Sequence, residues 1–310
     1  MKIIKNIDKK QQNLPNIALT IGNFDGIHFG HQKILQKLRL EAKKRNLKTA
    51  LLTFEPHPTK IFGKNSKNRI YNLSEKVRIL KIENYIDYLF IINFDRNLME
   101  ISANDFLENI LLNNINMKYL VTGYDFCFGK NRKGDAKFLN DNAEKLNFEF
   151  EQIAEQKFNN KTYSSSLVRT LIENGQIKEA NNILTRKFSI SGIIIKGRGL
   201  ARNLGYRTAN IFPKKYQIRA KFGVYKVEIS IANADFLPAI LNFGIKPTIT
   251  DDKKPIFEIY ILNFNQDIYG QKVRVRFLDF IREERKFKDI NELKKQIGRD
   301  IEICKEIINN

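Results

Sequence analysis

Short apolar runs alternate with helix-like patterns in the first half of the chain. The predicted strands are rich in Ile, Leu, Val and aromatic residues and cover residues 17–21, 49–54, 88–92, 119–122 and 148–153. Between these runs, Ser74 and Ser102 have the residue type of helix N-caps, and Asp105 follows Ser102 by three residues. Because strands that alternate with helices form parallel sheets covered by helices, this half predicts an α/β domain.

The pattern changes after residue 185. Two helical stretches, near residues 166–173 and 178–184, come before the change. Beyond it, strand-like runs follow one another with Gly, Pro and Asn turns, at residues 188–195, 224–231, 237–243, 256–262 and 273–278. Strands without intervening helices predict an antiparallel barrel or sandwich, which a charged amphipathic helix from about residue 289 closes. We therefore predict two domains, residues 1–186 and 187–310.

The charge of the chain favours an anionic partner. Its 54 Lys and Arg against 34 Asp and Glu give a formal net charge of +20, which suits nucleotides, nucleic acid or a lipid surface. The lysines are spread along the whole chain, however, so the charge is a weak argument for nucleic acid, and we expect no nucleic-acid partner. Cys127 and Cys304 lie far apart without a disulfide framework, and no apolar run approaches a signal peptide or membrane span. These features predict a cytoplasmic protein without a membrane partner.

The segment IGNFDGIHFGHQKIL holds two of the three histidines. His28 and His31 lie where a predicted strand gives way to a helix-like pattern, and side chains at i and i+3 share one side of a helix. Free backbone amides and the positive end of the helix dipole attract anions at such a junction, and Gly22 and Gly30 permit close approach. The segment predicts a phosphate clamp, in which both histidines donate hydrogen bonds to a nucleotide. A glycine-rich turn with two solvated histidines is the alternative.

Motifs along the chain carry a family resemblance. In order, they are GNFDGIHFGH, LTFEPHP, GYDFCFGKNRKGD and SSSLVR, then GIIIKGRGLARNLGYRTAN, FGVY, NFGIKPT and FEIYILNFNQDIYGQKVRVRF. Together they closely resemble the bacterial bifunctional riboflavin kinase/FAD synthetase family, from about residue 17 to about residue 287. The resemblance implies an N-terminal nucleotidyltransferase-type parallel sheet that adenylylates FMN to FAD. It also implies a C-terminal riboflavin kinase barrel that phosphorylates riboflavin to FMN. Both reactions would use ATP with Mg²⁺; the oligomeric state stays open.

The resemblance assigns residues of the first half to adenylyl transfer. His28 and His31 would stabilise the α- and β-phosphates of ATP, with Arg169 as a further catalytic group. The predicted ATP and phosphate contacts are Gly22, Asn23, Phe24, Asp25, Gly30, Ser164, Ser165 and Ser166. The predicted flavin contacts are Asp125, Phe126 and Phe128. Taken without the family, the serine triplet is typical of a helix cap or loop, and the aromatic residues are equally compatible with a turn packed into the core.

In the second half the resemblance implies a kinase site. Thr208 and Asn210 would hold Mg²⁺ and ATP phosphates, since hydroxyl and amide oxygens are hard ligands, and Gly197 would contact phosphate. Glu258 would be the base that takes the proton of the riboflavin 5′-hydroxyl. Without the family, a glutamate in an apolar strand is typical of the solvated face of a sheet.

Two departures from the family pattern affect the kinase loop. Ala201 stands where the family usually has glycine, and Arg207 stands where it has proline. An FAD synthetase with a weakened or inactive kinase domain is therefore one alternative. A basic nucleic-acid-binding protein is the other, and steep salt dependence of RNA binding would distinguish it.

Overall fold

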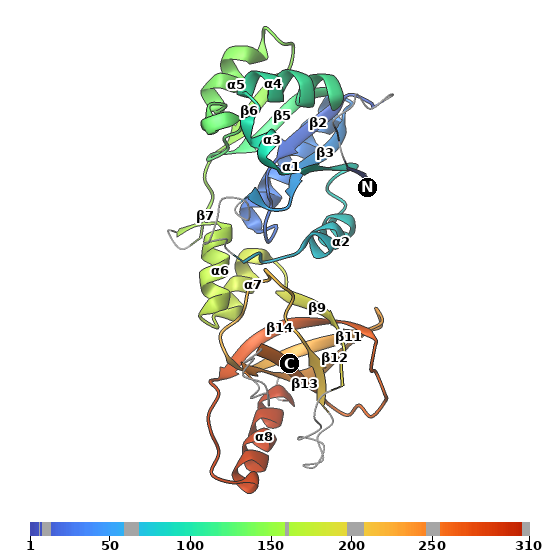
Figure 1. Ribbon diagram of the computed structural model, residues 1–310, viewed down its shortest axis with the longest axis vertical. Helices are drawn as coiled ribbons and strands as arrows, with labels where there is room; N and C mark the ends of the chain where they lie inside the picture. The colour runs from blue at the N-terminus through green and yellow to red at the C-terminus, as the bar shows by residue number, and fades with distance from the viewer. Residues whose placement is uncertain are drawn as a thin grey trace. The chain divides into compact units, whose positions relative to one another are not determined.

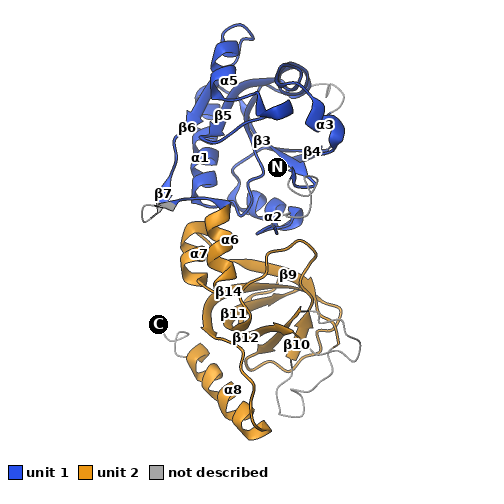
Figure 2. Cartoon of the chain, turned by 60° about the vertical axis from the view of Figure 1, so that its left-hand side comes forward, with its two compact units in different colours: residues 1–165 blue, residues 166–310 orange. Residues whose placement is uncertain are grey.

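The computed structural model describes residues 1–5, 7, 14–58, 68–158, 161–196, 208–245 and 255–305 (Figure 1). The chain divides into two compact units, residues 1–165 and 166–310 (Figure 2). This division groups α6 (Ser165–Glu173), apart from its first residue, and α7 (Ile177–Leu184) with the second unit. The domain boundary at residues 186 and 187 stays a prediction.

The first unit is built on a parallel six-stranded sheet. Its strand order is β1 (Lys2–Lys5), β4 (Tyr88–Asn93), β3 (Lys48–Glu55), β2 (Ile17–Ile21), β5 (Met117–Gly123) and β6 (Glu149–Ile153). All neighbouring strands pair in parallel, which confirms the predicted α/β fold. The five predicted strands correspond to β2 to β6. The sequence pattern missed β1, since only one of its four residues is buried.

Helices cover both faces of this sheet. On one face α1 (Phe29–Lys44) packs against β2, β3 and β5 and buries Leu35 and Leu38. The apolar core that includes Leu19 and Leu52 of the sheet also takes in Phe106 of a π-helix, η2 (Phe106–Asn114). The shorter elements are α2 (Leu73–Glu83), α3 (Arg96–Glu100), α4 (Ala103–Asp105), η3 (Lys130–Arg132), α5 (Ala136–Ala143), β7 (Lys157–Phe158) and β8 (Lys161–Thr162).

One of the two predicted helix caps is confirmed. The Ser102 Oγ accepts a hydrogen bond from the Asp105 amide at 3.0 Å and caps α4. The prediction for Ser74 is wrong, because α2 begins earlier and its cap is Asn72, whose Oδ1 accepts from the Glu75 amide at 3.0 Å. Asparagine caps a helix as well as serine does, so residue type alone did not separate the two positions.

The strand order creates a switch point between β2 and β5. From β2 the chain adds β3 and β4 on one side and then returns to place β5 on the other side. In open α/β sheets, ligands bind at such a point, outside the carboxyl ends of the strands. The histidine segment follows β2 directly and GYDFCFGKNRKGD begins at the last residue of β5, so both motifs belong to this edge.

The second unit contains an antiparallel barrel. Its strand order is β10 (Thr208–Ile211), β13 (Pro255–Ile261), β12 (Phe236–Ile245), β11 (Gly223–Ile231), β14 (Lys272–Arg282) and β9 (Ser189–Ile193). A bridge between Ile195 and Asn210, with Ile195 N donating to Asn210 O at 2.9 Å, joins the two end strands and closes the barrel. The predicted barrel is thereby confirmed. Strand β10 was not predicted, because its first three residues fall within a motif interpreted as a phosphate loop.

The final helix packs against the outside of the barrel. Cys304 and Ile301 of α8 (Ile290–Lys305) contact an apolar cluster that includes Val224 of β11. Asp300, 2% exposed, accepts a bidentate pair of hydrogen bonds from Arg282 at 3.0 and 2.7 Å. The predicted helix from about residue 289 is confirmed.

Two glycines of this unit give opposite stability predictions. A Cβ at Gly192 of β9 would lie 2.1 Å from Ile211 Cγ2 across the barrel closure, whereas one at Gly298 of α8 would meet nothing within 4 Å. Gly192→Ala should destabilise the barrel by about 1–3 kcal/mol through overpacking. Gly298→Ala should stabilise it by about 0.5–1 kcal/mol, because alanine favours the helix. Urea unfolding followed by circular dichroism measures both changes; equal effects would contradict the tight closure.

Candidate active sites

The loop after β2 has an unusual backbone. Phe24 and Ile27 both have a φ of 45°, and Gly26 has a φ of 83°. Left-handed conformations are strained for bulky and β-branched residues, and such strain persists only where the surroundings enforce it. Here Ile27 N donates to Phe24 O at 3.3 Å, and the Gln32 side chain donates to Ile27 O at 3.0 Å. The loop after β2 is therefore a strained turn at the switch point, and such strain is common in functional loops.

The turn brings the two histidines together. His28 is the N-cap residue of α1 and is 4% exposed. Its ring stacks on that of His31 with centroids 3.8 Å apart, and His31 stacks in turn on Phe24 at 4.5 Å. The arrangement at a helix N-terminus therefore suits an anionic ligand.

The glycines beside this stack make room for it. A Cβ at Gly22 would lie 3.1 Å from the Phe24 ring, and one at Gly30 would lie 3.3 Å from the His28 ring. Both contacts are tighter than ordinary van der Waals packing. The structure therefore gives Gly22 and Gly30 a packing role in the stack, and their predicted contact with ATP stays a prediction.

Asp25 anchors the turn to a distant segment. Its carboxylate is 4% exposed and accepts hydrogen bonds from the amides of Ile70 and Tyr71 at 3.1 and 3.2 Å. Its carbonyl accepts from the Ser165 hydroxyl at 2.8 Å, so Ser165 contacts the turn that carries the histidines, and its predicted phosphate contact stays a prediction. Ser164 lies next to Ser165 in the chain.

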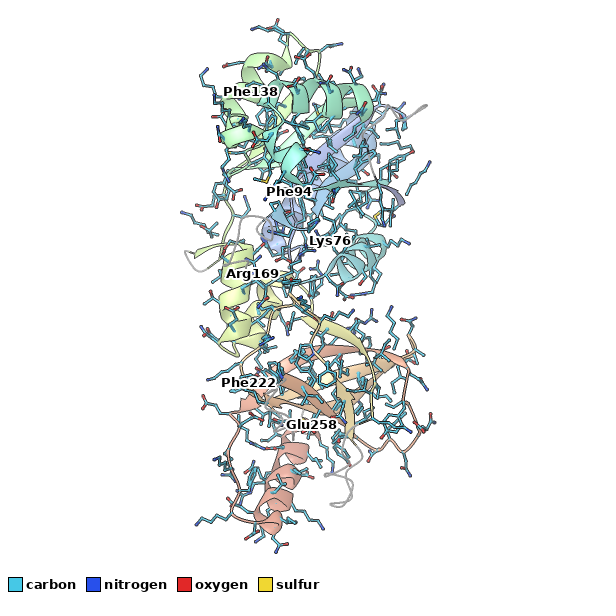
Figure 3. The ribbon with its side chains drawn as sticks, viewed as in Figure 1. Lys76, Phe94, Phe138, Arg169, Phe222 and Glu258 are labelled. Carbon is cyan, nitrogen blue, oxygen red and sulfur yellow. The ribbon has the colours of Figure 1, made fainter. Side chains whose placement is uncertain are left out.

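Ser166 and Arg169 follow Ser165 in α6 but belong to the second compact unit. Figure 3 labels Arg169 on that helix. Their part in binding phosphate stays a prediction.

Lys76 was missed by the sequence interpretation. It extends from α2, is 7% exposed, and donates to Asn23 O at 2.6 Å and to Thr53 Oγ1 at 3.2 Å (Figure 3). Burial lowers the pKa of its ammonium to about 8, and the Asp25 carboxylate partly opposes that shift. The signal was present, because Lys76 precedes Ile79 and Leu80 by three and four residues on the apolar face of the helix.

The predicted flavin residues divide between surface and core. Asp125 is exposed and Phe126 is half-buried. Phe128 is 7% exposed and belongs to the core, with ring centroids 5.4, 5.5 and 5.9 Å from those of Phe106, Phe126 and Phe138. Phe128 therefore occupies the place that the alternative interpretation gave it. A flavin contact stays a prediction for all three residues.

In the barrel, strand pairing aligns the predicted kinase residues. Asn210 of β10 lies directly opposite Glu258 of β13, which lies opposite Asn242 of β12. Side chains directly opposite in antiparallel strands share a face, with Cβ atoms about 5 Å apart. Thr208 is two residues before Asn210 and shares its face. Asn242 begins the NFGIKPT motif, but the sequence interpretation assigned it no role, because only the strand register places it beside Glu258.

This polar row lies on the outer face of the barrel. Phe257 and Ile259, on either side of Glu258, are buried toward the interior, while Glu258, which Figure 3 labels, is half-buried. Asn210 is 2% exposed, and its Oδ1 has no hydrogen-bond partner among the residues that the structure describes. A buried oxygen without a hydrogen-bond partner is suited to bind a ligand. Gly197, Ala201 and Arg207 lie outside the described residues.

Comparison with known proteins assigns a family to each part of the chain. A family model described as FAD synthetase matches residues 10–167, and one described as riboflavin kinase matches residues 184–308. The bifunctional riboflavin kinase/FMN adenylyltransferase of Buchnera aphidicola subsp. Schizaphis graminum is 38% identical and covers 100% of this chain and 99% of its own. The chain therefore belongs to the bifunctional riboflavin kinase/FMN adenylyltransferase family. The member from Escherichia coli K12 is 35% identical, covering 97% and 96% of the two chains.

A solved structure shares the family fold over its full length. It is described as a macrolide-efflux protein from Streptococcus pneumoniae, is 28% identical, and has a TM-score of 0.89 over 98% of this chain and 99% of that one. Among the residues described in our structure, no helix has both the length and the apolar character needed to cross a membrane.

Proposed function

We propose that the chain phosphorylates riboflavin to FMN in its barrel and adenylylates FMN to FAD in its parallel-sheet unit, using ATP in both reactions. The observation that carries the proposal is the pair of family matches, FAD synthetase over residues 10–167 and riboflavin kinase over residues 184–308. The predicted phosphate-binding histidines fall within the first match and the Asn210–Glu258 pair falls within the second. No nucleic-acid or membrane partner is needed for either reaction.

In adenylyl transfer, a phosphate oxygen of FMN attacks the α-phosphorus of ATP. The new P–O bond forms FAD, the bond to the β-phosphate oxygen breaks, and pyrophosphate leaves. No protein nucleophile is needed, so catalysis consists of alignment and stabilisation of charge. His28 and His31, stacked at the N-terminus of α1, are placed to donate hydrogen bonds to the α- and β-phosphates. The helix dipole favours the same negative charge.

In the kinase reaction, the riboflavin 5′-hydroxyl oxygen attacks the γ-phosphorus of ATP and ADP leaves. Glu258 accepts the hydroxyl proton, and its side chain is half-buried on the outer face of the barrel. Thr208 and Asn210 would hold Mg²⁺, and the unpartnered Asn210 Oδ1 supports this assignment among the described residues. A Mg²⁺ ion held by these residues would neutralise negative charge that develops during phosphoryl transfer.

An FAD synthetase with a weakened or inactive kinase domain is the alternative among enzymes. This alternative arises because Ala201 and Arg207 depart from the family pattern; both lie outside the described residues. Thr208, Asn210 and Glu258 are nevertheless retained, and the barrel register aligns Asn210 with Glu258. This alignment favours a working kinase.

Product analysis tests the proposal directly. The purified chain is incubated with riboflavin, ATP and Mg²⁺, and riboflavin, FMN and FAD are separated by chromatography; a parallel reaction starts from FMN. We expect FMN and FAD from riboflavin, and FAD from FMN. Formation of FAD from FMN without any FMN from riboflavin would establish the inactive-kinase alternative. Absence of both products from a folded chain would refute the proposed function.

Replacing either histidine should affect one reaction only. His28→Ala or His31→Ala should reduce the rate of FAD formation from FMN by roughly 10²-fold or more, the size expected for loss of one well-placed donor. Riboflavin phosphorylation by the same preparation serves as the control and should stay nearly unchanged. Equal losses in both reactions would instead indicate a folding defect or a shared site.

The kinase base gives the complementary prediction. Glu258→Gln preserves size and hydrogen bonding but cannot take the hydroxyl proton, so FMN production from riboflavin should fall by roughly 10²- to 10⁴-fold. FAD synthesis from added FMN should persist and confirms that the chain is folded. A variant that phosphorylates riboflavin at the wild-type rate would exclude Glu258 as the base.

A further inference from the structure

Backbone carbonyls along the strained turn are held by several different donors. Ile27 N, Ser165 Oγ and Gln32 Nε2 donate to the carbonyls of Phe24, Asp25 and Ile27, respectively. The carbonyl of Asn23, at the start of the turn, accepts from Lys76 Nζ at 2.6 Å. Among these donors only Lys76 carries a charge, and hydrogen bonds from charged donors are roughly twice as strong as neutral ones.

The ammonium of Lys76 occupies a costly position. Lys76 is 7% exposed and Thr53, its second acceptor, is fully buried on β3. A buried ammonium is retained only when it is paired and hydrogen-bonded. The charged groups that face it are Asp25 of the turn, Glu55 at the end of β3 and Arg69, which itself pairs with Glu55 at 2.6 Å.

A burial cost of this kind at a ligand-binding edge points to a role in the reaction. A buried titratable group with a specific charge partner is typical of functional sites. Methionine would fill a similar volume on α2 without the burial cost, but it could not hold the Asn23 carbonyl. The hydrogen bonds of Lys76 go to the Asn23 carbonyl and the Thr53 hydroxyl, so its effect on the histidines would pass through the backbone from Asn23 to His28.

We propose that Lys76 is a positioning residue for adenylyl transfer, whose buried ammonium holds the Asn23 carbonyl and thereby sets the geometry of the His28–His31 stack. This inference rests on the proposed role of the two histidines in FAD synthesis. Misplacement of reacting groups by about 1 Å can cost roughly 10²-fold in rate. Loss of the ammonium should therefore lower kcat for FAD synthesis more than it changes KM for ATP.

The titration of the buried Lys76 ammonium predicts a pH dependence of FAD synthesis. Because burial lowers its pKa to about 8, the ammonium loses its proton at a lower pH in the folded chain than in the unfolded chain. FAD synthesis should decline as the pH rises through about 8. The unfolded chain binds this proton more tightly, so the contribution of Lys76 to stability rises with pH over the same interval. Deprotonation of Lys76 therefore does not unfold the chain, and unfolding cannot explain the decline in FAD synthesis.

Three variants in the full-length chain test the inference. Lys76→Met should lower kcat for FAD synthesis from FMN by about 10- to 100-fold. Lys76→Arg retains a charged donor whose pKa lies far above 8, so it should recover part of the rate and show no decline near pH 8. Lys81→Met removes an exposed lysine from the last turn of the same helix and should behave like the wild type. Riboflavin phosphorylation and circular dichroism report folding.

The outcomes separate this inference from the proposed function. If the wild type makes no FAD, the proposed function fails first. If it does, an unchanged kcat in folded Lys76→Met, or a decline near pH 8 that persists in Lys76→Arg, overturns the role of Lys76. Should both variants fail to fold, the wild-type profile decides: a rate that stays constant to pH 9.5 refutes the inference, and a single ionisation near 8 supports it.

Discussion

The parallel pairing of β2 with β3 on one side and β5 on the other is the constraint on which the adenylyl-transfer site depends. It places the carboxyl ends of two strands, separated by almost a hundred residues in the chain, at one edge. The strained turn from β2 and the aromatic loop from β5 both start there. If β3 and β5 lay on the same side of β2, these two motifs would not share a switch point.

The strained turn remains in place because neighbouring elements hold it from several directions. Asp25 accepts amides from the segment after residue 67, Lys76 donates from α2, and Ser165 donates from the start of α6. Each left-handed bulky residue costs about 1–3 kcal/mol, so several contacts are needed to make the conformation dominant. The rigidity of the histidine stack is therefore a property of the unit and not of the loop alone.

The barrel unit positions its candidate site residues in a different way. Its candidate residues lie on regular strands, where the register of β10, β13 and β12 aligns Asn210, Glu258 and Asn242 without backbone strain. The closing bridge at Ile195 and the tight approach of Gly192 to Ile211 hold β10 in that register. A one-residue slip would turn Glu258 into the apolar interior, which its charge forbids.

The sequence by itself determined the parallel-sheet and barrel halves, most of their strands and the pairing of His28 with His31, because periodicity and short spacings record local burial and geometry. It did not determine that Asp25 binds backbone amides, that Phe128 lies in the core, or that Asn242 stands beside Glu258. It also did not show that Lys76 donates to the Asn23 carbonyl, and it gave no sign of β1. These features depend on partners distant in the chain. Only the strand order and register of the tertiary structure bring such partners within contact.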